Sequence, residues 1–309
     1  MYIVITNPKA GDGSAFRLLE LIQKEPLFRS NNCRSYQTEY NGHANTLVKS
    51  IVKTYYSAIK AVIIIGGDGT IHEVINGLAP WPELPVGIIP AGTGNDFARG
   101  LELKSQGITL FRKIMSQPNI VKFKIGQVDI LAGQRSATLY FINSAGTGLD
   151  SQVAATANES VFRRKLQKSR LGRLQYLFAF LKGMKRFKYV QAEVDIEGRR
   201  VKSKTFTLAV IANHPFFGKG MKIAPKSHLT SPKFSIILIE PITRWKLIFL
   251  FATVFAGKHI SLKKVHEVRG SSIKLKGTES LLLQLDGQIY RCDECRIKKT
   301  KESRLFLTD

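Results

Sequence analysis

The chain has 309 residues, of which 44% are hydrophobic, and these values exclude a disordered protein and favour two domains over one. Its 47 Lys and Arg residues outnumber its 23 Asp and Glu residues, which gives a formal net charge of +24. Such a charge attracts a protein to anionic surfaces, so nucleic acid and acidic membrane are both open as partners.

The cysteines and the apolar runs narrow the class of protein further. Three cysteines are too few for a disulfide framework and favour a reducing compartment. Cys292 and Cys295 form a CxxC pair that no second pair completes, so we expect two reduced thiols and no zinc site. The longest apolar run, Leu247 to Ala256, is about half the length of a spanning helix. The opening "YIVITN" lacks a signal-peptide pattern, and we expect a soluble or peripheral protein.

The first third of the chain alternates short apolar runs with helical patterns. The runs at Tyr2–Thr6, Ala61–Ile65 and Val86–Ile89 resemble strands that are buried on both faces. Helical patterns cover Ala15–Lys24, His43–Tyr55 and Ile71–Leu78. This alternation predicts an α/β domain with a parallel sheet and helices on both faces.

From about Val121 the period changes to many strand-like pieces separated by turn signals. The pieces are Ala137–Ser144, Thr205–Ala212, Phe234–Ile239, Ser272–Leu275 and Leu281–Asp286. This spacing predicts an antiparallel sandwich or barrel. Helical patterns interrupt it at Asn158–Tyr189 and at Arg244–Lys258.

A glycine-rich loop follows each of the three early strands. The loops are "NPKAGDGS" (7–14), "GGDGT" (66–70) and "PAGTGNDFAR" (90–99). Glycine lets backbone amides approach phosphate oxygens, and Thr70 and Thr93 supply hydroxyl donors or helix caps. Because the carboxyl ends of neighbouring parallel strands share one sheet edge, the three loops together predict a nucleotide site. Neither a Walker A motif nor GxGxxG is present.

Two acids in these loops indicate the chemistry. Asp68 and Asp96 lie in the second and third of these loops, where their negative charges would repel a phosphate group. This placement is reasonable if a cation lies between carboxylate and phosphate, or if an acid takes the proton of an attacking hydroxyl. We therefore predict a reaction at a phosphate group.

The motifs together resemble the diacylglycerol kinase catalytic family, specifically the bacterial soluble lipid kinases. They occur in order along nearly the whole chain: NPxxG (7–11), GGDGT (66–70), GTGNDFAR (92–99), NSAGTGLD (143–150), GKGMKIAP (218–225) and LDG (285–287). The resemblance implies a nucleotide-binding α/β domain at 1–122, to which about 300–309 return, and a β-sandwich domain for the lipid substrate at 123–299. It also implies transfer of the γ-phosphoryl group of ATP to a lipid hydroxyl, of diacylglycerol or a similar lipid.

The resemblance assigns site residues position by position. It implies ATP and Mg²⁺ as cofactors, with Asp68 and Asp96 at the metal and Asp68, Asp96 and Asp286 in catalysis. Glu73 and Asn76 resemble supports of the site. The implied nucleotide-binding residues are Asn7, Pro8, Lys9, Ala10, Gly11, Thr38, Gly66, Gly67, Asp68, Gly69, Thr70, Glu73, Thr93, Gly94 and Asn95.

The chain departs from the family pattern at two places. Gln288 stands where relatives usually carry a glutamate that is often assigned as the proton acceptor, and an amide cannot take that proton. The stretch 226–233 contains no acid where bacterial relatives tend to hold a structural Mg²⁺, so we predict that this second metal site is lost or weak.

Two stretches suggest contact with a membrane. Asn158–Tyr189 carries ten Lys and Arg residues among apolar ones and a single acid, as in a basic amphipathic helix on an anionic membrane surface. A solvated helix packed on the sandwich explains the same pattern. Arg244, Trp245 and Lys246 form a second candidate element. Neither stretch has the aromatic platforms of a nucleic-acid binder, so we expect no nucleic-acid partner.

Two alternative functions stay open beside the lipid kinase. NAD kinases use GGDGT on a similar two-domain plan, although NPxxG and GTGNDFAR favour a lipid acceptor. A catalytically silent sensor of nucleotide and membrane would explain Gln288. The expected location is the cytoplasm, peripheral at the inner face of the membrane, and a homodimer is one assembly that the sequence leaves open.

Overall fold

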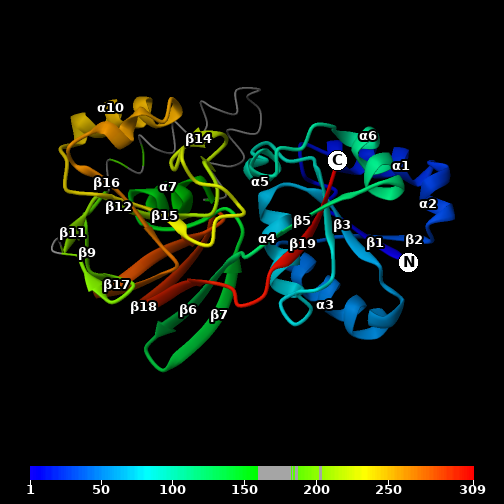
Figure 1. Ribbon diagram of the computed structural model, residues 1–309, viewed down its shortest axis with the longest axis horizontal. Helices are drawn as coiled ribbons and strands as arrows, with labels where there is room; N and C mark the ends of the chain where they lie inside the picture. Colours follow the sequence, from blue (N-terminus) through cyan, green and yellow to red (C-terminus); the bar gives the residue numbers. More distant parts are fainter. Residues whose placement is uncertain (159–181, 183, 185–186, 202–203) are drawn as a thin grey trace. The chain divides into compact units, whose positions relative to one another are not determined.

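The computed structural model describes residues 1–158, 182, 184, 187–201 and 204–309. The basic stretch predicted at Asn158–Tyr189 lies almost wholly outside the described residues. The chain divides into two compact units (Figure 1). The first contains residues 1–124 and 301–309, and the second contains residues 125–300.

The first unit is built on a six-stranded sheet in the order β2-β1-β3-β4-β19-β5. Every neighbouring pair is parallel except β5 with β19, so the sheet is mostly parallel as predicted. The strands are β1 (Tyr2–Thr6), β2 (Cys33–Gln37), β3 (Ala61–Gly66), β4 (Val86–Pro90), β5 (Asn119–Phe123) and β19 (Arg304–Thr308). The helices are α1 (Ser14–Gln23), α2 (Pro26–Ser30), α3 (His43–Tyr55), η1 (Tyr56–Ala58), α4 (Asp68–Gly77), α5 (Asp96–Gly100) and α6 (Gly107–Ser116).

The central strand β3 explains why this sheet is covered on both sides. All six of its residues are buried, and successive side chains point to opposite faces. Ile63 and Ile65 pack with apolar residues of α1 and α6 in one core. Figure 1 shows α3 on the other side of the sheet from α1 and α6. These layers confirm the α/β prediction for the first unit.

The second unit is an antiparallel sheet system with two helices over one face. Eleven strands form one sheet with the path β16-β15-β12-β8-β17-β18-β6-β7, to which β9, β10 and β11 attach, and β13 pairs with β14. The strands are β6 (Gly126–Ala132), β7 (Arg135–Phe141), β8 (Ser144–Gly148), β9 (Val190–Ile196), β10 (Arg199–Arg200), β11 (Thr205–Phe206), β12 (Leu208–Ala212), β13 (Phe216–Phe217), β14 (Met221–Lys222), β15 (Phe234–Ile239), β16 (Val265–Gly270), β17 (Ser272–Leu285) and β18 (Gln288–Lys299). The helical elements are α7 (Leu149–Asn158), α10 (Arg244–Phe255) and η2 (Lys258–Ser261).

Two apolar cores lie on the two faces of the sheet in this unit. Val210 of β12 and Ile237 of β15 face a core with α7 and α10. Their neighbours Ile211 and Ile236 face the opposite core, within the sandwich. Burial on both faces explains why β12 is wholly apolar and β15 is apolar except for Ser235.

Three strand predictions were wrong in detail. The piece predicted at Thr205–Ala212 is divided, because β11 ends at Phe206 and β12 begins at Leu208. The piece predicted at Ala137–Ser144 is divided, because β7 ends at Phe141 and β8 begins at Ser144. The two pieces predicted at Ser272–Leu275 and Leu281–Asp286 belong to the single strand β17, whose pairing with β18 is irregular between Lys276 and Leu281. Turn-like residues inside β17 mark this irregularity and do not end the strand.

Three further observations bear on the class of protein. Among the described residues, no helix is both long and apolar enough to pass through a bilayer. Cys292 and Cys295 are free thiols buried in the sandwich core. The described part of the chain contains no cluster of three or more His, Cys, Asp or Glu residues that could hold a metal ion.

Candidate active site

The three predicted phosphate loops meet at one edge of the first unit's sheet. Strands β1, β3 and β4 are neighbours, so the loops after them leave from the same edge. The Asn7 amide donates to the Ile65 carbonyl at 3.1 Å, and the Ala91 amide donates to the Gly66 carbonyl at 2.9 Å. The Asn7 side-chain amide donates to the Thr70 hydroxyl at 3.2 Å. The first loop is therefore bonded directly to GGDGT.

Glycine is required where the loops touch. A Cβ on Gly92 would lie 2.6 Å from the Cα of Gly67, so the backbones of the second and third loops pack against each other. Gly11 has a φ of +57°, and a Cβ there would collide with the Ala91 carbonyl. The three loops thus present backbone with few side chains in the way, as phosphate binding requires.

Asp68 joins the second loop to helix α5. Its carboxylate accepts the backbone N–H groups of Asp96 at 3.1 Å and Phe97 at 3.0 Å, at the start of α5. The Asp96 side chain is buried and accepts from Arg99 Nη1 at 2.8 Å. Arg99 also donates to the Gly94 carbonyl. The two acids that the sequence singles out are therefore adjacent, and each is held by a different partner.

The donor set around these acids fits a hard cation. Mg²⁺ is usually held by one or two carboxylates together with substrate phosphates and water. Each oxygen of Asp68 accepts one backbone N–H bond, and a carboxylate has about four acceptor sites, so these bonds are compatible with a cation. The Asp96 carboxylate is paired with Arg99, so Asp68 is the better placed ligand.

The predicted supports act through neighbouring backbone. Glu73 on α4 accepts N–H bonds from Gly42 at 2.9 Å and Ala44 at 3.1 Å, which anchors the start of α3. The side-chain Nδ2 of Asn76 donates to the His72 carbonyl within α4 at 2.9 Å. Neither contact tests a direct role in nucleotide binding.

The remaining predicted nucleotide residues lie on the same loops or beside them. The Thr38 amide donates to the Thr6 carbonyl at the end of β1 at 2.9 Å. The Asn95 side chain closes the third loop by bonding both backbone groups of Gly92. The others belong to the three loops themselves: Pro8, Lys9 and Ala10 to the first, Gly69 to the second, and Thr93 and Gly94 to the third.

Asp286 occupies a tight turn in the second unit. With φ values of +49° and +88°, Asp286 and Gly287 form the turn that joins β17 to β18. The Asp286 carboxylate accepts backbone N–H bonds from Ile142 at 2.9 Å, Asn143 at 2.8 Å and Ser144 at 3.1 Å. These three donors fix the acid against the segment between β7 and β8.

A buried polar network continues from this segment. His214 Nδ1 accepts the Phe216 amide at 3.2 Å, so the proton is on Nε2, which donates to Asn143 Oδ1 at 2.7 Å. Burial lowers the pKa of His214 to about 4, which keeps the ring neutral at pH 7. Lys299 Nζ donates to Asn213 Oδ1 at 2.8 Å, and burial lowers the pKa of Lys299 to about 8. The sequence reasoning gave His214 no role and missed Lys299, although polar residues directly after the apolar strand β12 were a signal.

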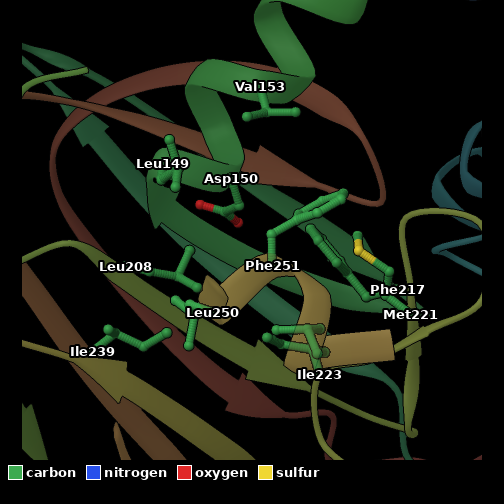
Figure 2. Close-up of a pocket in the computed structure, with 11 residues that line it drawn as sticks. Leu149, Asp150, Val153, Leu208, Phe217, Met221, Ile223, Ile239, Leu250 and Phe251 are labelled. Atoms are coloured by element: carbon green, nitrogen blue, oxygen red, sulfur yellow. The ribbon is translucent and has the colours of Figure 1, made fainter. Parts of the chain in front are cut away.

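An apolar cavity beneath α10 contains a buried acid that the sequence reasoning also missed. The cavity has a volume of about 60 Å³, which is small beside most ligand pockets (Figure 2). Asp150, at the start of α7, is the only ionisable side chain among the described residues that line it, and the others are Leu149, Val153, Leu208, Phe217, Met221, Ile223, Ile239, Leu250, Phe251 and Val254.

Asp150 is an unusual carboxylic acid. Among the described residues, neither of its oxygens has a hydrogen-bond partner with acceptable geometry, although Gln284 and the Ser151 amide lie near enough to favour the charged form slightly. The carboxyl rests over Gly146, where any Cβ would collide with it. Burial raises the pKa of Asp150 to about 7.

Replacing Asp150 with asparagine should change how stability depends on pH. The folded state keeps the Asp150 proton up to about pH 7, whereas the unfolded state releases it near 3.8, so the free energy of unfolding falls as pH rises between these values. From about pH 5 to about pH 8, the wild type should lose on the order of 3 kcal/mol relative to Asp150→Asn. Urea unfolding of both proteins measures this, with the exposed Asp293→Asn as control. Parallel curves for wild type and Asp150→Asn would contradict the assignment.

The fold and the loops define a kinase of two units, and comparison with known proteins places it in a family. The model of the "Diacylglycerol kinase catalytic domain" matches residues 1–128, and that of the "YegS C-terminal NAD kinase beta sandwich-like domain" matches residues 143–292. "Putative lipid kinase YtlR" of Bacillus subtilis (strain 168) is 33% identical to this chain over 93% of each. The chain belongs to the diacylglycerol kinase catalytic family and is a kinase, for which ATP is the implied phosphate donor.

Two further similarities support this membership. A "Diacylglycerol kinase" of the same Bacillus subtilis strain is 30% identical over 74% of this chain and 70% of that protein. The solved structure of "a putative diacylglycerol kinase from Bacillus anthracis str. Sterne" superposes with a TM-score of 0.75 at 21% identity and covers 100% of this chain and 95% of that one. The structural likeness shows the fold.

Proposed function

We propose that this kinase transfers the γ-phosphoryl group of ATP, with Mg²⁺, to a hydroxyl of diacylglycerol or a similar lipid. The cavity beneath α10 carries the proposal, because apolar walls with one carboxyl group suit an acyl chain that carries an ester or hydroxyl. A neutral carboxyl at Asp150 can donate to such a group as well as accept from it. The names of the two Bacillus subtilis relatives agree with this acceptor.

The first unit supplies the phosphate chemistry in this proposal. The loops after β1, β3 and β4 would hold the phosphates of ATP by backbone N–H groups, and Asp68 would hold Mg²⁺, which neutralises charge on the phosphates. The acceptor oxygen forms a bond to the γ-phosphorus while the bond to the bridging oxygen of ADP breaks. The hydroxyl proton passes to a carboxylate, for which Asp68 and Asp286 are the candidates.

The proposed place of action is the surface of an anionic membrane, on the cytoplasmic side. A diacylglycerol acceptor lies in a bilayer, and the formal net charge of +24 attracts the chain to acidic lipid. An NAD kinase is the second candidate, since the family model of the second unit carries that name in its description. A soluble dinucleotide would need polar partners, whereas this cavity is lined almost wholly by apolar side chains.

Filling the cavity should raise the KM for the lipid without affecting ATP. In Val254→Trp the larger ring would occupy the space beneath α10, so we expect the KM for diacylglycerol in mixed micelles to rise at least about ten-fold. The KM for ATP should stay unchanged, because the loops lie in the other unit. Initial rates with labelled ATP measure both constants. Val268→Trp, an exposed position on β16, makes the same change at the surface, and Val254→Phe is the milder cavity variant.

Three results would count against the proposal. Equal lipid KM values in Val254→Trp, Val268→Trp and the wild type would remove the cavity from acceptor binding. Labelled NADP without labelled lipid would establish the NAD kinase. ATP binding without product from any lipid or from NAD would establish a silent nucleotide-binding relative.

A further inference from the structure

After the cations of its first turn, helix α10 is apolar from Leu247 to Phe255 except for Thr253, which is unusual for a helix with an exposed face. Its inner side chains Leu247, Leu250 and Val254 are buried in the core beneath it. Its outer face consists of Trp245, Ile248, Phe249 and Ala252, all exposed. These positions recur at three- and four-residue spacing, so they form one continuous stripe.

The outer face of α10 is a concentrated apolar surface. Trp245 is 83% exposed, the highest value among the large hydrophobic side chains of the described residues, and Phe249 is 63% exposed. Tyr189, also exposed, donates its hydroxyl to the Ile242 carbonyl two residues before α10 begins. Exposed tryptophan and tyrosine side chains are typical of the boundary between lipid and water.

The segment that contains this face carries charges of one sign. From residue 244 to residue 264 the chain contains Arg244, Lys246, Lys258, Lys263 and Lys264 and no Asp or Glu. All five cations are exposed. Each Lys or Arg near an anionic leaflet strengthens the affinity for the membrane by up to about ten-fold, and the contributions of several cations combine. A second copy of the chain is a poor partner, because a symmetric contact would bring the same cations together.

The same helix forms a wall of the cavity that contains Asp150. Leu250, Phe251 and Val254 of α10 line that cavity, and Figure 2 shows Leu250 and Phe251 beside Asp150. One side of α10 therefore faces the proposed acceptor site while the other faces solvent. A lipid leaving a bilayer in contact with the outer face would have only the thickness of one helix to pass.

We propose that the outer face of α10 docks on, and partly enters, a bilayer that contains anionic phospholipid, and so brings the cavity to its lipid acceptor. The inference rests on the proposed lipid acceptor for its purpose, but the docking is measurable without catalysis. Apolar insertion supplies the contact, and the surrounding cations supply the preference for acidic lipid.

Tryptophan fluorescence tests the docking directly, because the chain has only two tryptophans. Trp81→Phe leaves Trp245 as the single reporter. With phosphatidylcholine vesicles that also contain phosphatidylglycerol, its emission should shift to the blue, and lipids with brominated acyl chains should quench it. Vesicles of phosphatidylcholine alone should give a weaker response.

A matched pair of substitutions distinguishes binding through this face from a general effect of exposed apolar side chains. Phe249→Asn should lower the partition coefficient onto acidic vesicles at least about ten-fold, since a buried phenylalanine contributes strongly to transfer into lipid. Ile120→Asn removes a side chain of nearly equal exposure, 62%, from β5 of the first unit and should have little effect. Sedimentation with vesicles, without ATP, gives both coefficients.

The outcomes distinguish the docking from the proposed function. A protein that phosphorylates diacylglycerol while bromolipids leave Trp245 unquenched refutes the docking and leaves the lipid kinase standing. Quenching of Trp245 without phosphorylation of any lipid supports the docking and refutes the lipid kinase. A blue shift that depends on protein concentration in the absence of vesicles would assign the face to a dimer and overturn the proposal.

Discussion

Replacing Asp68 with asparagine should lower kcat for lipid phosphorylation by about two to four orders of magnitude. The substitution removes the carboxylate best placed to hold Mg²⁺ or to accept the hydroxyl proton in the first unit. It also sets an amide N–H₂ against one of the two backbone N–H groups that Asp68 binds at the start of α5. That second effect should cost about 1 kcal/mol of stability, as the loss of a helix cap does.

Rate and stability can be separated for this variant. Initial rates give kcat, binding of ATP by calorimetry should stay within about ten-fold of the wild type, and thermal unfolding reports the lost contact with α5. Glu20→Gln makes the same change in charge on the exposed side of α1 and should match the wild type in all three. If kcat of Asp68→Asn equals that of Glu20→Gln, the site chemistry assigned to Asp68 is wrong. If only the unfolding temperature differs, Asp68 is a structural cap.

Much of the architecture was accessible from local patterns. Strand β3 is buried on both faces, so its uninterrupted branched residues could belong only to a central strand or a buried helix, and its short length favoured the strand. Helix α3 has the bounds that its periodicity predicted. Strand β15 was also predicted with its observed bounds, because both its faces are buried.

Elements with weak burial were not predicted. Strand β5 exposes most of its side chains, and β2 has no fully buried residue, so neither shows a strong apolar pattern. Both lie at the edges of their sheet, where one backbone edge lacks a neighbour within that sheet and side-chain burial is smaller. The short helix α5 depends on Asp68, which is 28 residues away from Asp96, and no local capping signal reveals it.

The candidate site divides in the same way. The gathering of the three glycine loops followed from strand order, since β1, β3 and β4 had to be neighbours for the loops to share an edge. Contacts between distant segments did not follow. Asp150 is four residues from Gly146, but its burial results from β12 and α10 closing over it, which no spacing within NSAGTGLD encodes.

Replacing Gln288 with glutamate should raise kcat by at least about ten-fold. Gln288 is the first residue of β18, directly after the turn of Asp286 and Gly287, and it is half-buried. The Asp286 carboxylate accepts three backbone N–H bonds and the Asp68 carboxylate accepts two, so both candidate proton acceptors also hold the backbone in place. A carboxylate at position 288 would supply a base at the position where members of the diacylglycerol kinase catalytic family usually have a glutamate.

The pH profile and a charge control decide what the new carboxylate does. Gln191→Glu adds the same charge at an exposed position of β9, so a gain shared by both variants would be a general effect of net charge. A gain confined to Gln288→Glu, with a new acidic limb in the pH dependence of kcat, would identify a general base. An unchanged or lower kcat would mean that this chain has transferred the proton-accepting role to Asp68 or Asp286. Phosphoryl transfer depends mainly on the positioning of the reactants and on the metal ion. A base at Asp68 or Asp286 would therefore explain how a kinase of this family could have the glycine loops and the acids together with glutamine at position 288.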